Sequence, residues 1–475
     1  MICIEKISNT HVELCHLTKS VACTYIYCCK PSQWSPIKIF QIISRLTIWT
    51  NTTIHYSSFT LSCFSTNLNT TVEVVLLYKP ADNDRYLRRL RAEGVTVVNV
   101  IERSIAFMIL RTLRHLVSSF LLLFLLVPGS EVGMRKIWQV LIDLVSRFHY
   151  NNCRAFFSRS NYDLLHVFTP DTGAILMIRA GKEAGIPILY HEMGTPHYLP
   201  ALEPYYRRLE KVLPLCSQVA ALSPLLAKQW SERYPFLNSV AVLPLIAEDS
   251  AALNLSAGTN GVRETIFGCA ARIERGKGPF VLADALAQLR QKRNDVAVRL
   301  AGTGPALQEV KARARELQLN GSWEMVGSYE GPVGCSAFLR TLDVFVLPSF
   351  AEGTSKSVIE AMAHGLPIIA TNIGGLPDLV TPESGILVPA GDSEALAEAM
   401  DRLASDPKLR RSMGQGARDQ YLKLFAPDAV LFMLASTYSH IVGNGHHPVT
   451  TRGKSHPWAI ETNGQLRSRA CNQAG

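Results

Sequence analysis

Short apolar runs alternate with longer helical patterns over much of this chain, and that alternation limits its fold more than any other feature. Between residues 265 and 405, apolar runs of strand length are separated by amphipathic segments of helical length. The predicted strands are 265–271, 296–301, 323–327, 344–348 and 367–371. The predicted helices are 279–292, 305–317, 335–341 and 392–405, followed by 407–425. Because parallel strands need long crossover connections, this order predicts a parallel sheet with helices on both faces.

A similar alternation precedes this series. Strands are predicted at 72–78, 95–100, 163–168, 185–191, 217–223 and 240–244, with helices at 82–93, 173–184 and 224–233. Residues 247–263, between the two series, are small and polar, which is typical of an interdomain linker. The sequence therefore predicts an α/β protein of two doubly wound, Rossmann-like domains, residues 71–246 and 264–425, that face each other across a cleft.

The two ends of the chain depart from this pattern. Residues 1–70 contain no glycine and show no sustained period of a helix or a strand. They are interpreted as a disordered segment, a misread start or an unusual extension. Residues 426–442 are predicted to form a helix that crosses back to the first domain. The His-, Gly- and Asn-rich residues 443–475 are predicted to be disordered.

Charge and cysteine content restrict the class of ligand. The net charge of +9 and the pI near 9.0 fit a site for a phosphorylated ligand, or attraction to an anionic membrane. No motif that reads RNA or DNA is present, so we expect no nucleic-acid partner. Six of the 11 cysteines precede residue 64 and none forms a C-x-x-C pair. We therefore expect buried thiols in a reducing compartment and no zinc site.

Leu116–Val127 is the most apolar stretch of the chain. It is shorter than the roughly 18 residues that a membrane-spanning helix needs, and Arg111 and Arg114 precede it. It is predicted to be a buried helix, with a helix lying on a membrane surface as the alternative. We therefore expect a cytoplasmic protein, with peripheral contact at the inner face of the plasma membrane as the alternative.

The segment Phe350–Pro367 is the most informative one for function. Glu352 follows the predicted strand 344–348, and ligands of open α/β sheets bind at the carboxyl ends of the strands. Three turn residues then precede a predicted short helix, and their amides would form a cradle for a pyrophosphate. These turn residues are Gly353, Thr354 and Ser355.

Three further charged residues are expected to complete this site. Glu360 lies eight positions after Glu352 on the short helix, where its carboxylate can accept hydrogen bonds from sugar hydroxyls. Arg272 and Lys277 flank the loop after the strand 265–271. A guanidinium and an ammonium beside a diphosphate would neutralise the charge that develops as it leaves. The alternatives are two solvated loop cations, and a surface helix whose glutamates stabilise its first turn.

The order of these motifs resembles the retaining glycosyltransferases of family 4. Arg-x4-Lys at 272–277 is followed by Ala-Gly-Thr-Gly-Pro at 301–305 and Val-Gly-Ser-Tyr at 326–329. Leu-Pro-Ser-x2-Glu-Gly-x6-Glu-Ala-Met-Ala-x-Gly-Leu-Pro then runs from 347 to 367, and Asn-Ile-Gly-Gly-Leu-Pro-Asp-Leu-Val follows at 372–380. The resemblance covers about residues 71–440 and is strongest in the second half.

The resemblance implies a GT-B fold in which the second domain binds a nucleotide diphosphate sugar. Arg272 and Lys277 would bind the diphosphate, Glu360 the ribose hydroxyls, and Glu352 the transferred sugar. Family members retain the anomeric configuration without a metal, so no metal and no cofactor besides the nucleotide sugar co-substrate is expected. The residues implied to line the donor site are Gly353, Thr354, Ser355, Gly302, Gly304 and Val326.

The first domain carries weaker signals. His191 stands where many family members place a histidine that faces the sugar and the acceptor; the alternative is a loop histidine bonded to the backbone. Glu192 and His197 are further candidates for the acceptor site. The chain also departs from the family pattern, since its first glycine is Gly94 and Pro244-Leu-Ile-Ala-Glu-Asp replaces the usual Asn-Gly-Val-Asp.

The leading hypothesis is a retaining transfer of a sugar from a nucleotide diphosphate sugar to a hydroxyl of a saccharide or lipid-linked saccharide. Such a reaction would serve cell-surface polysaccharide or glycolipid synthesis. The alternatives are a relative that binds the donor without transferring it and a sugar-nucleotide epimerase. A nicotinamide-dependent dehydrogenase fits least, because Gly302-Thr-Gly304 lacks the third glycine and no suitable acidic residue follows.

Overall fold

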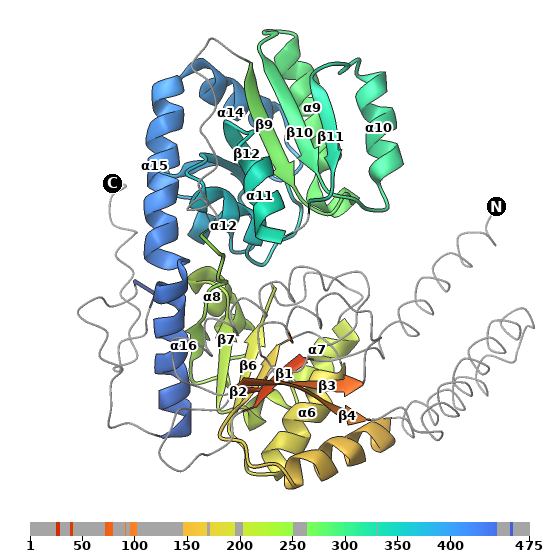
Figure 1. Ribbon diagram of the computed structural model, residues 1–475, viewed down its shortest axis with the longest axis vertical. Coiled ribbons are helices and arrows are strands. Elements are labelled where there is room, and N and C mark those ends of the chain that lie inside the picture. Colours follow the sequence, from red (N-terminus) through yellow and green to blue (C-terminus); the bar gives the residue numbers. More distant parts are fainter. Residues whose placement is uncertain are drawn as a thin grey trace, which may run out of the picture.

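Two α/β domains, one above the other in Figure 1, are joined along one side by two long helices. The computed structural model describes residues 25–28, 39–40, 72–78, 91, 96–101, 146–168, 172–194, 203–249, 264–329, 331–443 and 457–458. The predicted helix 116–127 lies outside these residues, as do His197, nearly all of the predicted helix 82–93 and nearly all of the tail. Within the described part of the chain, no helix combines the length and the apolar character that a membrane span requires.

The second domain is built on a six-stranded sheet in which every pairing is parallel. Its strands, in spatial order, are β11 (Trp323–Gly327), β10 (Val296–Ala301), β9 (Thr265–Ala270), β12 (Val344–Leu347), β13 (Ile368–Thr371) and β14 (Gly385–Val388). Every residue of β9, β12 and β13 is buried, as expected of central strands covered on both faces. Five of these strands were predicted, and β14 was not.

Helices cover the second sheet. They are α9 (Pro279–Arg290), α10 (Leu307–Glu316), α11 (Gly331–Leu339), α12 (Lys356–Ala363), α13 (Leu376–Leu379), α14 (Ser393–Ser405) and α15 (Pro407–Leu424). Asp392 and Asp406 each accept hydrogen bonds from first-turn amides, of α14 and α15 respectively, and so fix where these helices begin. Only α13, one turn long, has no counterpart among the predicted helices.

The first domain contains an eight-stranded sheet. Its strands are β1 (Tyr25–Cys28), β3 (Val72–Tyr78), β2 (Ile39–Phe40), β5 (Leu165–Phe168), β6 (Ile188–Glu192), β7 (Gln218–Ala221) and β8 (Val240–Val242) in spatial order, with β4 (Thr96–Ile101) paired to β3. All pairings are parallel except those of β1, which runs antiparallel to β3 and β5. Residues 1–70 thus supply two strands, although their sequence shows no strand period.

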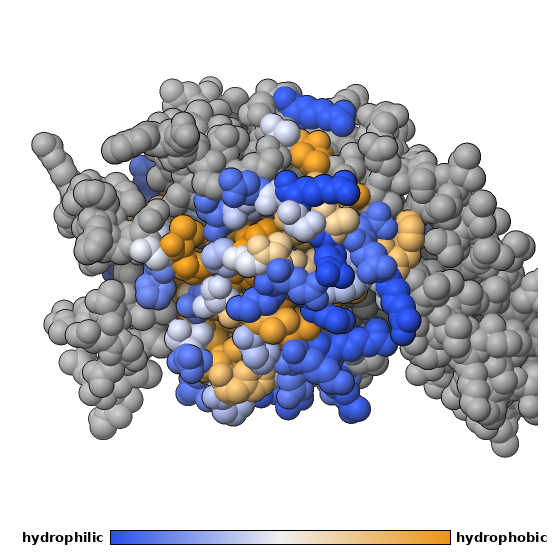
Figure 2. All heavy atoms as spheres, turned by 90° about the horizontal axis from the view of Figure 1, so that it is seen from below, coloured by the Kyte–Doolittle hydropathy of each residue, from blue (hydrophilic) through white to orange (hydrophobic). Residues whose placement is uncertain are grey.

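The helices α6 (Thr172–Glu183), α7 (Glu203–Leu209) and α8 (Pro224–Arg233) accompany this sheet. The sequence predicted α6 and α8, but neither α7 nor the helical residues 146–158. On the face of this domain seen in Figure 2, hydrophilic and apolar described residues are interspersed rather than gathered in separate patches. That is the ordinary character of a solvated surface.

Two chain crossings join the domains. At the first, Asp249 forms a two-pronged ion pair with Arg418 of α15, at 2.7 and 2.8 Å, and the Tyr421 hydroxyl donates to the Ala247 carbonyl. At the second, α15 is followed by α16 (Pro427–Val442), which runs along the first domain (Figure 1). The Tyr438 hydroxyl of α16 lies 2.7 Å from Nδ1 of His166 in β5. Residues 426–442 therefore contact the first domain.

Candidate active site

The loops that follow β9, β10 and β11 are hydrogen-bonded into one unit at the carboxyl edge of the second sheet. The Ile273 amide donates to the Thr303 carbonyl at 3.0 Å, and the Gly302 amide donates to the Gly327 carbonyl at 2.7 Å. Because the Gly302 amide is engaged in this way, it does not point at a ligand. The unit holds the loop that carries Arg272 and Lys277.

Glycine is required in this unit for close approach of two backbones. Gly302 has a φ of +136°, and a Cβ there would lie 2.0 Å from the Ala271 carbonyl oxygen. A Cβ at Gly304 would lie 2.3 Å from the carbonyl oxygen of Ile273. Both glycines, predicted to bind the nucleotide, therefore have a packing role that accounts for them without a ligand.

The loops after β12 and β13 meet this unit on its other side. The Phe350 amide donates to the Gly276 carbonyl at 2.9 Å, and the Gly375 amide donates to the Gly353 carbonyl at 2.7 Å. Gly374 has a φ of +53°, and a Cβ there would lie 1.8 Å from the Glu352 carbonyl oxygen. The loop around Glu352 is therefore held between its two neighbours at the sheet edge, where ligands of such folds bind.

Lys277 and Glu352 form an ion pair at the centre of this edge. The Lys277 Nζ lies 2.7 Å from Oε1 of Glu352, and the Ser349 hydroxyl donates to the same oxygen at 2.8 Å. The two side chains are only 23% and 9% exposed. The structure thus brings together two residues that the sequence separates by 75 positions. A partly buried cation fixed by a carboxylate is suited to bind an anionic group at the cleft.

Glu360 lies on α12, which begins directly after this loop. Its Oε1 accepts a hydrogen bond from Nζ of Lys356 at 2.8 Å, and both side chains are less than one-fifth exposed. The Glu360 charge also acts on Tyr329 and Cys335, whose pKa values burial raises first and Glu360 raises further. Tyr329, which follows β11, and Cys335 of α11 therefore lie near Glu360.

Ser355 is the N-cap residue of α12, but its side chain caps no amide. Its hydroxyl instead lies 3.1 Å from the Ser357 hydroxyl. The Thr354 hydroxyl is buried and has no hydrogen-bond partner among the described residues. First-turn amides of a helix lack partners within the helix, so this end of α12 keeps the capacity to bind an anion that the sequence predicts.

Two of the predicted donor-site residues lie at the margins. Arg272 forms an ion pair with Glu274 of its own loop, with 3.2 Å between Nη1 and Oε2. Val326, on the edge strand β11, is 42% exposed. Neither Ser349 nor Lys356 is among the residues predicted from the sequence. Lys356 stands four residues before Glu360, a spacing that signals a helical ion pair.

The first domain reaches this site through the turn after β6. A Cβ at Gly353 would lie 2.4 Å from the Met193 carbonyl oxygen and 3.0 Å from the Gly194 Cα. Glu352–Gly353 of the second domain therefore lies against Met193–Gly194 of the first, and any larger residue at 353 would force the two domains apart.

His191, at the carboxyl end of β6, is fully buried rather than exposed to the cleft. Its ring lies 4.8 Å from Phe168 and 5.5 Å from His166, centroid to centroid. Burial lowers the pKa of His191 to about 3, which keeps the ring neutral. Neither ring nitrogen has a partner with hydrogen-bond geometry among the described residues, although the Leu243 backbone lies near enough to oppose part of the pKa shift. His166, which lies within hydrogen-bond distance of the Tyr438 hydroxyl, has a structural place in the first domain.

Glu192 is buried beside the same turn and holds it in shape. Its carboxylate accepts hydrogen bonds from the Tyr190 hydroxyl at 2.7 Å and from the Met193 and Gly194 amides at 3.0 and 3.2 Å. Burial raises the pKa of the Glu192 carboxyl to about 7, against the opposing effect of these three donors. All of these contacts are internal, so the structure gives Glu192 a supporting role in the turn after β6.

Replacing Glu192 with Gln is expected to abolish a loss of stability that occurs as the pH rises. Folded Glu192 keeps its proton up to a pH of about 7, whereas the unfolded carboxyl loses it near 4.5. Between these values the folded protein binds more protons, so its free energy of unfolding falls with rising pH, by about 3 kcal/mol at most. Urea unfolding at about pH 5 and about pH 8 measures this for both proteins.

The difference in unfolding free energy between the variant and the wild type reports on Glu192 alone, because both proteins contain the same buried histidines. Glu210→Gln, at an exposed position of the same domain, is the matched control and is expected to keep the pH dependence of the wild type. A difference in unfolding free energy that is equal at both pH values would show that Glu192 does not titrate in this window.

Comparison with known proteins assigns the second domain. The sequence profile described as "Glycosyl transferases group 1" matches residues 257–420. The second domain belongs to the group 1 glycosyltransferase family. A D-inositol 3-phosphate glycosyltransferase of Pseudarthrobacter chlorophenolicus is 36% identical over 152 residues, which are 31% of this chain and 36% of that protein. A lipopolysaccharide core biosynthesis mannosyltransferase of Rhizobium meliloti is 31% identical over 185 residues, 37% of this chain and 51% of that protein.

Solved structures extend the likeness to the first domain. A glycosyltransferase from Rickettsia africae superimposes with a TM-score of 0.61 at 17% identity, over 84% of this chain and 97% of that one. The Anabaena protein HepE, solved with UDP and glucose, gives a TM-score of 0.56 at 17% identity, over 81% and 95%. The chain therefore has the predicted GT-B fold. By sequence it spans between about a third and a half of the length of the first curated relatives that it matches.

Proposed function

We propose that this protein is a retaining glycosyltransferase that moves a sugar from a nucleotide diphosphate sugar to a hydroxyl acceptor. The observation that carries this proposal is the partly buried Lys277–Glu352 pair at the carboxyl edge of the second sheet, directly before the helix that carries Glu360. The cation and the uncapped helix start suit the diphosphate of such a donor. The two carboxylates suit the hydroxyls of its sugar and of its ribose.

Each residue takes a role from its surroundings. Lys277 binds the diphosphate together with the amides at the start of α12, and Arg272 adds positive charge from the same loop. Glu352 accepts hydrogen bonds from hydroxyls of the transferred sugar, and Glu360 accepts them from the ribose. Positive charge on these fixed side chains stabilises the diphosphate as it leaves, which requires no metal ion in this scheme.

The acceptor is proposed to be a saccharide or a lipid-linked saccharide. The relatives named above are, by their names, a glycosyltransferase for inositol 3-phosphate and a mannosyltransferase of lipopolysaccharide core biosynthesis. Inositol 3-phosphate presents hydroxyls next to an anionic group. A basic protein of net charge +9 suits such acceptors, since opposite charge speeds their encounter. Transfer of this kind belongs to polysaccharide or glycolipid synthesis.

The test begins with isothermal titration of the full chain with UDP- and GDP-sugars, followed by an assay for nucleoside diphosphate released when a saccharide acceptor is added. Binding, acceptor-dependent release and an unchanged anomeric configuration by NMR are expected, with activity retained in EDTA. The proposal fails if none of these nucleotide sugars binds. Binding without release would instead identify a protein that holds the donor without transferring it, and donor conversion without acceptor would identify an epimerase.

A further inference from the structure

A carboxylate of the second domain caps a helix of the first. Oδ2 of Asp378, on α13, accepts a hydrogen bond from the Leu225 amide in the first turn of α8, at 2.7 Å. The Ser223 hydroxyl, at the N-cap of α8, also hydrogen-bonds to Asp378. Helix starts favour negative charge and need acceptors for their free amides. Asp392 and Asp406 cap the helices that they themselves precede, whereas Asp378 does so across the domain boundary.

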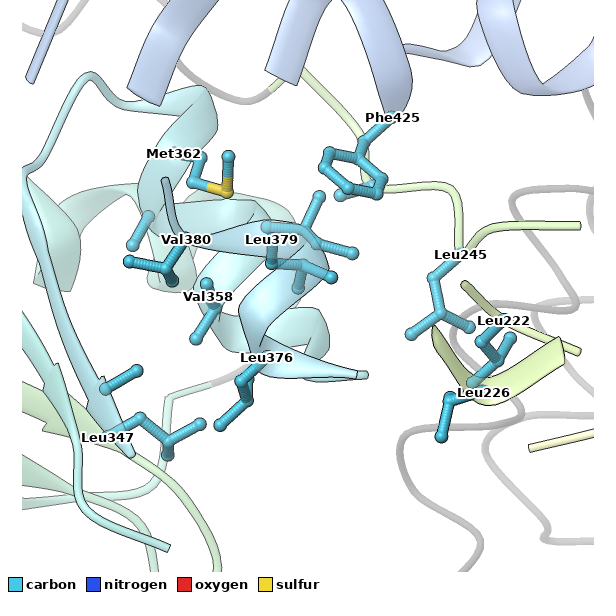
Figure 3. Close-up of a cluster of buried hydrophobic side chains, with 14 of the residues drawn as sticks. Leu222, Leu226, Leu245, Leu347, Val358, Met362, Leu376, Leu379, Val380 and Phe425 are labelled. Atoms are coloured by element: carbon cyan, nitrogen blue, oxygen red, sulfur yellow. The ribbon is translucent and has the colours of Figure 1, made fainter. Parts of the chain in front are cut away.

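Apolar side chains from both domains surround this contact. Leu376 and Leu379 of α13 are fully buried, as is Leu226 of α8. Figure 3 shows them in one cluster with Leu245 and Phe425, which lie at the two chain crossings. The contact therefore lies beside the crossings about which the domains would move. We call Ser223, Leu225, Gly375 and Asp378 the α8–α13 joint.

The joint is continuous with the loop that carries Glu352. Gly375 directly precedes α13, and its amide donates to the Gly353 carbonyl at 2.7 Å. A Cβ at Gly375 would lie 3.0 Å from the Ser223 hydroxyl oxygen, so the backbone of this loop touches the start of α8 itself. On its other side, Gly353 lies against the Met193 carbonyl. The first domain is thus held against the Glu352 loop at two points.

The energy of the joint is a balance of opposed contributions. Burial raises the pKa of Asp378, and the hydrogen bonds from Ser223 and Leu225 oppose that shift. Removing a carboxylate from water costs free energy, and its hydrogen bonds offset only part of that cost. A contact balanced in this way can form and break as a cleft closes and opens, unlike the wholly apolar contacts around it.

We propose that Asp378 is a positioning residue that holds the first domain, through α8, against the loop of Glu352 and Gly353 in the closed arrangement of the cleft. The consequence for catalysis rests on the proposed function: with the joint open, donor binding by the second domain persists while transfer slows, because the first domain no longer closes over the sugar. The structural consequence does not depend on that function.

Hydrogen exchange of the full chain, measured by mass spectrometry without substrate, tests the joint. Asp378→Ala is expected to raise the exchange of peptides covering the start of α8, Met193–Gly194 and Gly353. The rise expected is roughly 2- to 30-fold, the range for loss of one helix cap. Asp392→Ala, which removes a cap within one domain, is expected to raise exchange only at the start of α14.

Two further measurements keep the proposal open to refutation. Asp378→Asn keeps an acceptor oxygen and should show a smaller effect, which covers the case in which the Ala variant fails to fold. The radius of gyration from X-ray scattering should increase for Asp378→Ala. Unchanged exchange around Gly353, or an unchanged radius of gyration, would overturn the proposal. If the wild type transfers sugar, Asp378→Ala should lower kcat and leave the nucleotide affinity unchanged. If the wild type does not transfer sugar, the proposed function fails, and the exchange result still tests whether Asp378 holds the α8–α13 joint.

Discussion

Lys277→Met is expected to lower the rate of sugar transfer by about 10²- to 10³-fold, the usual effect of removing one fixed group that stabilises developing charge. Methionine keeps most of the length of the side chain and removes the ammonium. Without it the departing diphosphate loses a charge partner, and Glu352, only 9% exposed, keeps the Ser349 hydroxyl as a donor but loses the ammonium. Steady-state kinetics with a nucleotide sugar and a saccharide acceptor measure the effect.

Arg275→Met is the matched control, because Arg275 stands in the same 3-10 turn as Lys277. Its side chain is 75% exposed and pairs with Glu309 away from Glu352. This control should keep nearly full activity, since exposed ion pairs contribute little. Thermal unfolding of both variants separates a loss of chemistry from a loss of fold. Equal activities of the two variants would remove Lys277 from the proposed machinery.

The sequence predicted the second domain closely because its central strands are buried on both faces. Such strands are continuous apolar runs between Gly- and Pro-containing turns, and five of the six appear within a few residues of their predicted bounds. The strand β14 was missed, since the run Gly385–Val388 is short and only partly buried. In the first domain, β1 and β2 lie in a segment without a periodic pattern, so only tertiary pairing reveals them.

The candidate site was predictable where the strand ends carry charged residues. Lys277 and Glu352 were both selected, and the fold joins them because β9 and β12 are neighbours in the sheet. The glycines of the β10 loop were assigned to a ligand, whereas Gly302 and Gly304 have a packing role that no spacing rule separates from binding. The place of Asp378 could not be foreseen, because its partner is a backbone amide 153 positions away in the other domain.

Glu360→Ala is expected to weaken the binding of nucleoside diphosphate by about 1.5–3 kcal/mol, or roughly 10- to 150-fold, the range for a hydrogen bond to a charged group. Glu232→Ala is the matched control: Glu232 also follows a helical lysine by four residues but is 63% exposed and lies in the first domain. Titration calorimetry gives both affinities.

The decisive comparison adds a nucleoside diphosphate that lacks both ribose hydroxyls. If Glu360 accepts hydrogen bonds from these hydroxyls, their removal weakens binding to the wild type but hardly affects binding to Glu360→Ala, because their partner is already gone. Such a double-mutant cycle separates a direct contact from a general loss of structure. A general loss of structure would weaken the binding of both ligands by the same free energy. Lys356, 2.8 Å from the Glu360 carboxylate, keeps that side chain directed along α12 in the free protein, so the carboxylate is in place before the ribose arrives. Fully additive losses would mean that Glu360 supports the site through Lys356 and the neighbouring Tyr329 rather than by touching the ribose.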